Sequence, residues 1–444
     1  MGVLTFSFVY LSLPIKSFHL NSKSKISWKT ASGIVMANMI GTGVFTSLGF
    51  QLTVVQNTWS ILLLWIIGGI MALMGALVYA ELGTHFKKTG GDYIFLSETI
   101  HPIVGYLYAW VSLVVGFSAP IAIAAMAMND YLEPLVGKSI LPGLLFLLFI
   151  PWVHIFSIKR SAQFQDLMTG FKIIFILALI GIGFLFSSKA IPQAFDFSSS
   201  WQQEVLLPGF AVSLIYVFYA YTGWNSAAYI TEEIDHPRKN LPKALIGATL
   251  GVMLLYLLVQ LVILKHASVD QLSGQVNIAN LAFGNLFGPN GALWVSVCIG
   301  IQLIATISGY AWVGPRVTFA MAKDYSLWKP LSVVNSQGIP VRAIFVNSGI
   351  SLFLFVTGSF EQIMLYAGFI LQLMSTVTVF SSLKIKQELG FKTPLKPLLQ
   401  LIYIIFSLAL MVYLLRDRPL ESLAGIGILV LGLGVYALDK KTGK

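Results

Sequence analysis

The stretch Gly33-Ile-Val-Met-Ala-Asn-Met-Ile-Gly-Thr-Gly-Val-Phe45 decides the fold of this chain. It lies within an apolar run, near residues 31–55, that is long enough to span a lipid bilayer. Gly41 and Gly43 flank Thr42 in the middle of this run, where a regular helix would be expected. Irregular backbone at membrane depth is tolerated only where it is buried in protein or lines a cavity. The stretch therefore predicts a membrane-spanning helix that is interrupted near its centre.

A second interruption, Phe218-Tyr-Ala-Tyr-Thr-Gly-Trp-Asn225, lies in another spanning run in the second half of the chain. Small residues inside a membrane helix can also serve close helix packing, and one interruption alone would favour that interpretation. Paired interruptions at corresponding positions of two halves are typical of secondary transporters, whose substrate site lies near the bilayer midplane. Because both segments carry free hydrogen-bonding side chains, the pair predicts a transporter with discontinuous helices 1 and 6.

The composition supports an all-α, polytopic membrane protein. Of the 444 residues 57% are hydrophobic and only 10% are charged, and the mean hydropathy is +0.81. The net charge of +10 would point to nucleic acid in a soluble protein. In a membrane protein it reflects basic loops on one side, so we expect a lipid bilayer around the chain and no nucleic-acid partner.

Apolar segments of about twenty residues predict twelve transmembrane helices. They lie near residues 31–55, 59–82, 102–129, 141–158, 163–186, 206–234, 241–264, 289–320, 342–358, 361–383, 397–415 and 419–438. No linker separates soluble domains, so residues 31–438 form a single transporter domain. The two interruptions indicate a 5+5 inverted repeat, with repeat one near 31–186, repeat two near 206–383, and two extra helices near 397–438.

The basic residues predict the orientation of these spans. Most of the 28 Lys and Arg residues fall on one side of the membrane. The opposite side holds five: Lys138, Lys189, Lys265, Arg416 and Arg418. The positive-inside rule therefore places both termini, residues 1–30 and 439–444, in the cytoplasm of a multi-pass protein of the plasma (inner) membrane. Basic residues follow the apolar opening Gly2 to Pro14, an order that argues against a cleaved signal peptide.

The interruptions offer complementary groups to a zwitterion. The N–H groups around Thr42 and Gly43, at the positive end of a half-helix, suit a substrate carboxylate. Carbonyl groups freed at both interruptions suit an ammonium group, and Asn225 is the best side-chain contact in the sequence. Tyr219 and Tyr310 could form aromatic walls or a gate, although such residues also serve simple packing.

Lys172 is the second strong signal. It lies about ten residues into the fifth predicted span, about 15 Å along the helix, from where its ammonium group can hardly reach the interface. We expect it to face the bundle interior. Two interpretations stay open: a proton carrier, or a permanently charged tether that binds carbonyls of the unwound first helix.

Other chemistries find little support. The six histidines lack metal-ligand spacing, and no nucleophile–base arrangement lies near a membrane face. We therefore expect no metal, no cofactor and no enzymatic activity. The single cysteine, Cys298, lies in an apolar stretch, and no partner subunit is evident. Outside the spans, Gly90 to Tyr93 predicts the start of a short interfacial helix ending near Ile100, whereas Ser268 to Leu286 predicts a polar connection, either a lid or a passive loop.

Several segments resemble the amino acid–polyamine–organocation (APC) superfamily. They are Met39-Ile-Gly-Thr-Gly-Val-Phe45, Glu81-Leu-Gly with Gly90-Gly-Asp-Tyr93, Gly223-Trp-Asn-Ser-Ala with Glu232-Glu and Asn240-Leu-Pro242, Gly314-Pro-Arg316, and Ala320-Met-Ala-Lys-Asp324. The likeness covers nearly the whole chain after residue 30. It is similar to the L-type and broad-specificity branch, and it implies the five-plus-five fold with proton-coupled uptake or exchange of amino acids.

The resemblance also implies roles for individual residues. The substrate amine is held by carbonyls that map to Met39, Tyr219 and Thr222, and the carboxylate by the loop at Thr42 and Gly43. Ile40 and Gly41 lie within the same site. Lys172 matches a fifth-helix lysine of several prokaryotic members, a coupling role, and Tyr310 falls near an aromatic gate. In Tyr221-Thr222 the chain departs from the Tyr-Asp that related transporters often carry, which leaves selectivity open.

The sequence thus predicts a secondary active transporter that works by alternating access. Its substrates are neutral or a broad range of amino acids, moved by proton-coupled symport or by exchange. A cationic amino acid or polyamine carrier is the alternative within transport, but the predicted pocket has no evident carboxylate. A non-transporting amino acid receptor is the alternative from another class.

Overall fold

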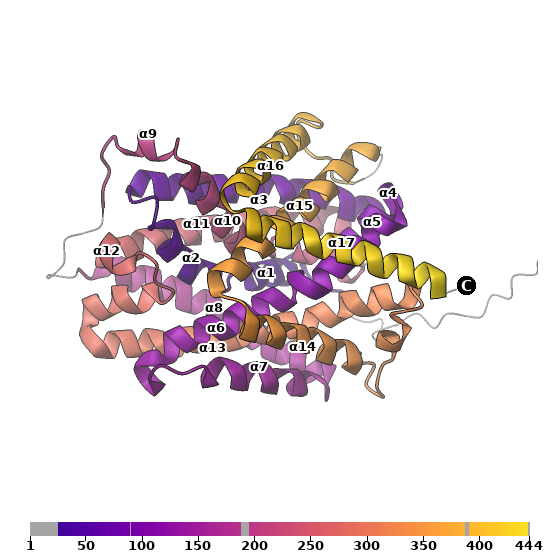
Figure 1. The fold of residues 1–444 in the computed structure, drawn as a ribbon, viewed down its shortest axis with the longest axis horizontal. Helices are drawn as coiled ribbons and strands as arrows, with labels where there is room; N and C mark the ends of the chain where they lie inside the picture. The colour runs from indigo at the N-terminus through magenta and orange to yellow at the C-terminus, as the bar shows by residue number, and fades with distance from the viewer. Residues whose placement is uncertain (1–24, 89, 188–194, 387–389, 443–444) are drawn as a thin grey trace, which may run out of the picture.

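The computed structural model describes residues 25–88, 90–187, 195–386 and 390–442. This part of the chain is helical throughout, without a β-strand (Figure 1). The helices are α1 (Trp28–Met39), α2 (Gly43–Gln51), α3 (Thr58–Phe86), α4 (Asp92–Thr99), α5 (Pro102–Val111), η1 (Ser112–Gly116), α6 (Ser118–Val136), α7 (Leu141–His154), α8 (Ile158–Leu185), α9 (Trp201–Glu204), α10 (Pro208–Tyr221), η2 (Ser226–Glu233), α11 (Pro237–His266), α12 (Val269–Leu272), α13 (Ile278–Asp324), η3 (Lys329–Ser332), α14 (Val341–Thr357), α15 (Phe360–Ser381), η4 (Ser382–Lys384), α16 (Leu398–Asp417) and α17 (Pro419–Thr442).

The helices confirm a polytopic membrane protein. Among the described residues nine helical segments are long and apolar enough to cross a bilayer. Two further apolar helices, α7 and α14, are shorter, and α10 with η2 forms one more broken segment. Helices satisfy every backbone group internally, which is the condition for crossing hydrocarbon. The exact number of twelve spans stays a prediction.

The bundle has two distinct ends. Figure 1 shows α9 and α12 at one end and α4 with the C-terminus at the other, while α1 lies in the middle, surrounded by other helices. α1, the first half of the first broken helix, therefore lies inside the bundle. Irregular backbone at the end of such a helix is tolerated there, because neighbouring helices separate it from lipid.

Both predicted interruptions are confirmed. α1 ends at Met39 and α2 begins at Gly43, so the first break is confined to Ile40, Gly41 and Thr42. α10 ends at Tyr221, and the chain then continues through a turn into the 3₁₀ helix η2. Both breaks are narrower than the stretches that predicted them.

Glycine allows the two breaks to touch. A Cβ atom on Gly43 would lie 2.5 Å from the Cα atom of Ala220. Gly223 has a φ of +100°, and a Cβ atom on it would lie 2.7 Å from the carbonyl carbon of Asn38. Each break therefore contributes a glycine that fits against the backbone of the other, an approach that no side chain would permit.

Two boundaries differ from prediction. The connection between the seventh and eighth spans is mostly helical, because α12 and the start of α13 replace the expected polar loop from Ser268 to Leu286. Gly288, with φ of +72°, bends α13 so that its first part turns away from the long span. α8 begins at Ile158, before the predicted start of the fifth span, because Ser157 caps its N-terminus through Arg160 N–H. The short helix expected after Gly90 is confirmed as α4.

Candidate functional site

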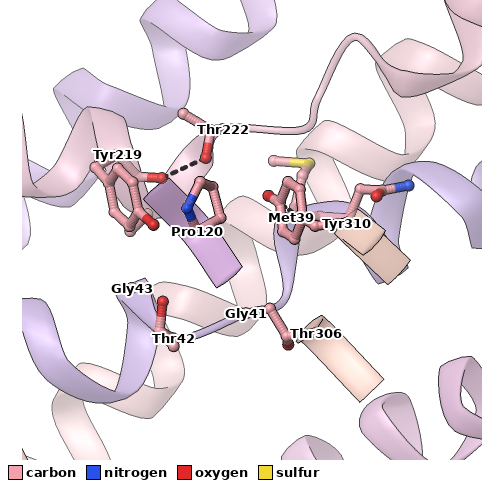
Figure 2. A pocket seen from close by; sticks show the side chains of 11 residues that line it. Met39, Gly41, Thr42, Gly43, Pro120, Tyr219, Thr222, Thr306 and Tyr310 are labelled. Carbon is pink, nitrogen blue, oxygen red and sulfur yellow. Dashed lines mark hydrogen bonds between the residues drawn. The ribbon is translucent and has the colours of Figure 1, made fainter. Parts of the chain in front are cut away.

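A small cavity lies between the two breaks (Figure 2). Its walls come from the two broken helices and from α6 and α13: Asn38, Met39, Gly41, Thr42, Gly43, Pro120, Tyr219, Ala220, Thr222, Thr306 and Tyr310. Its volume of about 10 Å³ is close to the room that one water molecule needs. All of these side chains are uncharged, so the walls offer hydrogen-bonding groups without a fixed charge.

The carbonyl groups at the end of α1 are bound by side chains from three other helices. Lys172 Nζ of α8 donates to the Ala37 carbonyl at 3.2 Å. The Tyr310 hydroxyl of α13 donates to the Asn38 carbonyl at 3.4 Å. The Tyr256 hydroxyl of α11 lies 2.6 Å from the Met39 carbonyl. The last turn of a helix leaves such carbonyls without partners, and here the tertiary structure supplies them.

Lys172 lies where the sequence predicted, inside the bundle. Its side chain is buried, with 4% of its surface exposed. Besides the Ala37 carbonyl, Nζ donates to the Thr306 hydroxyl at 3.1 Å. Thr306 itself lines the cavity and donates to the Gln302 carbonyl. Lys172 therefore contacts the first broken helix directly and the cavity wall through Thr306.

The start of α2 lies at the cavity, with Thr42 and Gly43 among the lining residues. The first N–H groups of a helix have no acceptor within the helix, and the helix dipole favours negative charge there. The Thr46 hydroxyl donates to the Thr42 carbonyl at 3.0 Å and closes the first turn. Figure 2 shows Thr42 and Gly43 across the cavity from Tyr219 and Thr222. This end of α2 can receive a carboxylate.

The second break is stabilised by its own residues. The Thr222 hydroxyl donates to the Tyr219 carbonyl at 2.7 Å, a bond drawn in Figure 2. Thr222 N–H donates to the same carbonyl at 3.0 Å. The Ser226 hydroxyl donates to the Gly223 carbonyl at 2.5 Å. Small polar side chains thus replace the missing helical bonds of this segment.

The structure brings most of the predicted site residues together. Seven of them line the cavity: Met39, Gly41, Thr42, Gly43, Tyr219, Thr222 and Tyr310. Two do not. Ile40 packs its fully buried side chain into the apolar core. The Asn225 amide is turned away from the cavity, toward Tyr229 at 3.2 Å and Asp92 at 3.5 Å.

Asn38 and Ala220, which lie within the two predicted interruptions, also line the cavity, whereas three residues of the site outside these stretches escaped prediction. Pro120 and Thr306 line the cavity, and Tyr256 binds a carbonyl beside it. A proline in the interior of the third span was a usable signal, since it disturbs the helix around it. Next to it in the chain the helix widens into the π-helical turn η1, a feature frequent at functional sites. Nothing in the pattern of α11 singles out Tyr256 among other apolar residues.

A second polar cluster lies at the end of the bundle that contains α4. The fully buried Asp92 carboxylate accepts hydrogen bonds from the hydroxyls of Tyr229 and Thr378, each at 2.7 Å, and from the Tyr79 hydroxyl. Tyr108 in turn bonds to Tyr229. Burial raises the pKa of Asp92, while the hydroxyl donors act in the opposite direction. Through Asp92 the cluster joins α3, α4, α5, η2 and α15. The sequence predicted a short interfacial helix here but not the contacts of Asp92.

Comparison with known proteins matches almost the entire chain. The profile of a family described as amino acid permease matches residues 26–423. The Large neutral amino acids transporter small subunit 2 of Mus musculus is 28% identical over 437 residues, which cover 94% of this chain and 81% of that protein. The Asc-type amino acid transporter 1 of Homo sapiens is 26% identical over 448 residues, 96% of this chain and 84% of that protein. The b(0,+)-type amino acid transporter 1 of Mus musculus is 26% identical over 423 residues, 91% and 85% respectively.

Proposed function

The chain belongs to the amino acid permease family and is an amino acid transporter, and we propose that it carries neutral amino acids, bound as zwitterions between its two broken helices. The observation that carries this proposal is the cavity itself, with the N-terminal end of α2 on one side and residues of α1 and α10 near it. In the proposed binding mode Thr42 and Gly43 hold the carboxylate. Carbonyl groups of Met39 and Tyr219 hold the ammonium group.

The uncharged walls support a neutral substrate. Among the described residues that line the cavity, none is acidic or basic. A cationic side chain taken out of water would need a carboxylate partner to offset its desolvation. A relative whose name describes it as a transporter of large neutral amino acids also supports a neutral substrate. A cationic or polyamine substrate is the less supported alternative.

The conformation described here is closed around the site. A cavity of about 10 Å³ is far too small for an amino acid, so substrate must enter another conformation. The proposed mechanism is alternating access, in which one bundle of helices moves against the other around the fixed site. We propose that the Asp92 cluster, which joins the second break to α3, α4, α5 and α15, holds the cytoplasmic side shut in this state.

Two coupling schemes assign different roles to Lys172. As a tether, it stays charged and keeps its bonds to the Ala37 carbonyl and the Thr306 hydroxyl. As a proton carrier, it loses one donor when it releases its proton, which loosens the link between α8 and α1. In the first scheme the protein exchanges substrates; in the second it is a proton symporter.

We place the transporter in the plasma membrane with both termini in the cytoplasm. The excess of basic residues on one side of the predicted spans supports this orientation. Residues 1–24, the larger part of the predicted N-terminal segment, lie outside the described part of the structure.

The names of the relatives bear on whether this chain works with a partner subunit. The words "small subunit" in the names of relatives say that those proteins belong to a larger assembly, against our expectation of no evident partner. The cavity walls nevertheless come from this chain alone, and its single cysteine, Cys298, lies within α13 rather than in a loop. We propose that the chain transports without a second subunit.

Uptake into proteoliposomes that contain only this purified chain tests the proposal. Labelled neutral and cationic amino acids are offered with and without internal substrate and with and without an inward pH gradient. We expect uptake of neutral amino acids and little uptake of cationic ones. Binding without uptake would instead indicate a receptor, and activity only after addition of a second chain would refute independent function.

The same assay with Lys172→Ala separates the two coupling schemes. For a proton carrier, the variant loses acceleration by the pH gradient while exchange against internal substrate persists. For a tether, wild-type uptake responds to internal substrate and not to pH, and the variant loses at least about tenfold in rate because the unwound α1 is no longer held. Lys323→Ala, a change at an exposed lysine at the end of α13, is the control.

A further inference from the structure

One hydroxyl group contacts both broken helices at once. Tyr256, in α11, is fully buried. Its hydroxyl oxygen lies 2.6 Å from the Met39 carbonyl of α1 and 3.0 Å from the Ala220 carbonyl of α10. Both carbonyls belong to residues that line the cavity, whereas Tyr256 itself lies behind them. Any effect of this residue on substrate must therefore act through the two carbonyl groups.

The Tyr256 hydroxyl has one hydrogen for two carbonyl acceptors. A tyrosine hydroxyl has one hydrogen to donate, and a carbonyl group can only accept. Tyr256 can therefore satisfy Met39 or Ala220 at a given moment, and the other carbonyl needs a donor from elsewhere. A buried carbonyl without a donor costs free energy, so the second carbonyl favours a hydrogen-bond donor that enters the cavity.

The ring of Tyr256 is fixed, so that only its hydroxyl hydrogen can turn. Trp65 packs edge-on against it with the ring centres 5.4 Å apart. Tyr221 lies on another side at 5.1 Å. One turn further along α11, the Gln260 amide donates to the Val44 carbonyl of α2 at 3.2 Å. α11 thus holds both halves of the first broken helix and the end of α10.

We propose that Tyr256 is a positioning residue for the substrate ammonium group. Its hydroxyl donates to the Met39 carbonyl when the site is empty, and turns to the Ala220 carbonyl when an ammonium group binds Met39. The ammonium group supplies the missing donor, and both carbonyls are then satisfied. Binding at the first break therefore changes the hydrogen bonding at the second. This inference rests on the proposed function, the transport of zwitterionic amino acids.

The test compares substrates with and without the ammonium group. Uptake of a labelled amino acid is inhibited with unlabelled L-alanine or L-lactate, and with L-leucine or L-2-hydroxy-4-methylpentanoate. In each pair the side chain and carboxylate are the same, and only the ammonium group is replaced by a hydroxyl. The ratio of the two inhibition constants measures recognition of the ammonium group.

Tyr256→Phe keeps the ring and removes the hydroxyl. We expect the preference for the amino acid over its hydroxy acid to fall about tenfold, because the Met39 and Ala220 carbonyls lose the hydroxyl that fixes their direction toward the ammonium group. Tyr221→Phe is the matched control. It removes a hydroxyl from the same aromatic cluster, but one that donates to the Trp65 carbonyl of α3 at 3.0 Å, away from the breaks. Its preference should equal that of the wild type.

Each outcome has a distinct meaning. An active Tyr256→Phe variant with an unchanged preference overturns the inference and leaves the proposed function intact. Wild-type protein without uptake refutes the proposed function itself. If Tyr256→Phe does not reach the membrane, Tyr256→Met is measured instead, since it also removes the hydroxyl donor. An unchanged preference in Tyr256→Met, or failure of both variants to fold beside a normal Tyr221→Phe, shows a purely structural role and overturns the inference.

Discussion

Single residues show how closely the two halves of this transporter are fitted. Gly43 and Gly223 carry no side chain because the other break occupies the space where one would lie. The sequence marked both glycines as interruptions of a helix. It did not reveal that they are contact points, because the distance to Ala220 or Asn38 depends on how helices far apart in the chain pack.

Gly43→Ala tests the contact between the breaks. The added methyl group would lie 2.5 Å from the Cα atom of Ala220, a backbone atom that cannot move without shifting α10. We expect uptake to fall at least about tenfold, since misplacement by about 1 Å can cost a factor of about one hundred. Gly33→Ala is the control, because a Cβ atom at Gly33 meets no atom within 4 Å. Normal uptake by Gly43→Ala would show that the breaks need not touch.

At the scale of elements, the structure adds connections that run across the bundle. α11 reaches both breaks through Tyr256 and Gln260, and α8 reaches α1 through Lys172. α4, which the sequence predicted as a short interfacial helix, brings Asp92 into contact with η2 and α15. All of these contacts except that between Tyr256 and Ala220 link residues more than a hundred positions apart in the chain.

The buried Asp92 carboxylate predicts a dependence of stability on pH. Burial raises its pKa above the ordinary value of 3.8, so the folded protein binds this proton at a higher pH than the unfolded chain. Its neighbours are the neutral hydroxyls of Tyr79, Tyr229 and Thr378 and the Asn225 amide. The contribution of Asp92 to stability therefore increases as the pH falls toward 3.8 and decreases as the carboxyl ionises.

Thermal unfolding in detergent between about pH 7 and about pH 5 measures this contribution. We expect the unfolding temperature of Asp92→Asn, relative to the wild type, to decline as the pH is lowered, because only the wild type gains from protonation. Asp270→Asn, at an exposed carboxylate in α12, should follow the wild type across the range. Parallel curves for Asp92→Asn and wild type would contradict the prediction.

The whole molecule is a helical bundle whose two ends face different compartments. The distribution of Lys and Arg predicts that the loop between α6 and α7 is extracellular and that the start of α11 is cytoplasmic. Lys138 and Lys239 are exposed residues in these two places. They allow the orientation to be tested without disturbing the site.

Labelling of single cysteines tests the orientation. In a Cys298→Ser background, a membrane-impermeant thiol reagent should label Lys138→Cys in intact cells. It should label Lys239→Cys only after the cells are permeabilised, because that position faces the cytoplasm. The reverse pattern would mean that the positive-inside rule misplaces this protein.

The sequence by itself determined the class of fold, the positions of both interruptions and the buried lysine. These follow from local chemistry: apolar length sets the spans, and glycines with small polar residues weaken a helix wherever they occur. Only the tertiary structure decided which groups meet. It drew Asn225 toward Asp92 instead of the cavity, placed Pro120 and Thr306 in the walls, and aimed Tyr256 at two carbonyls. A periodic apolar pattern shows that a side chain is buried, but the partner it meets depends on the packing of helices distant in sequence.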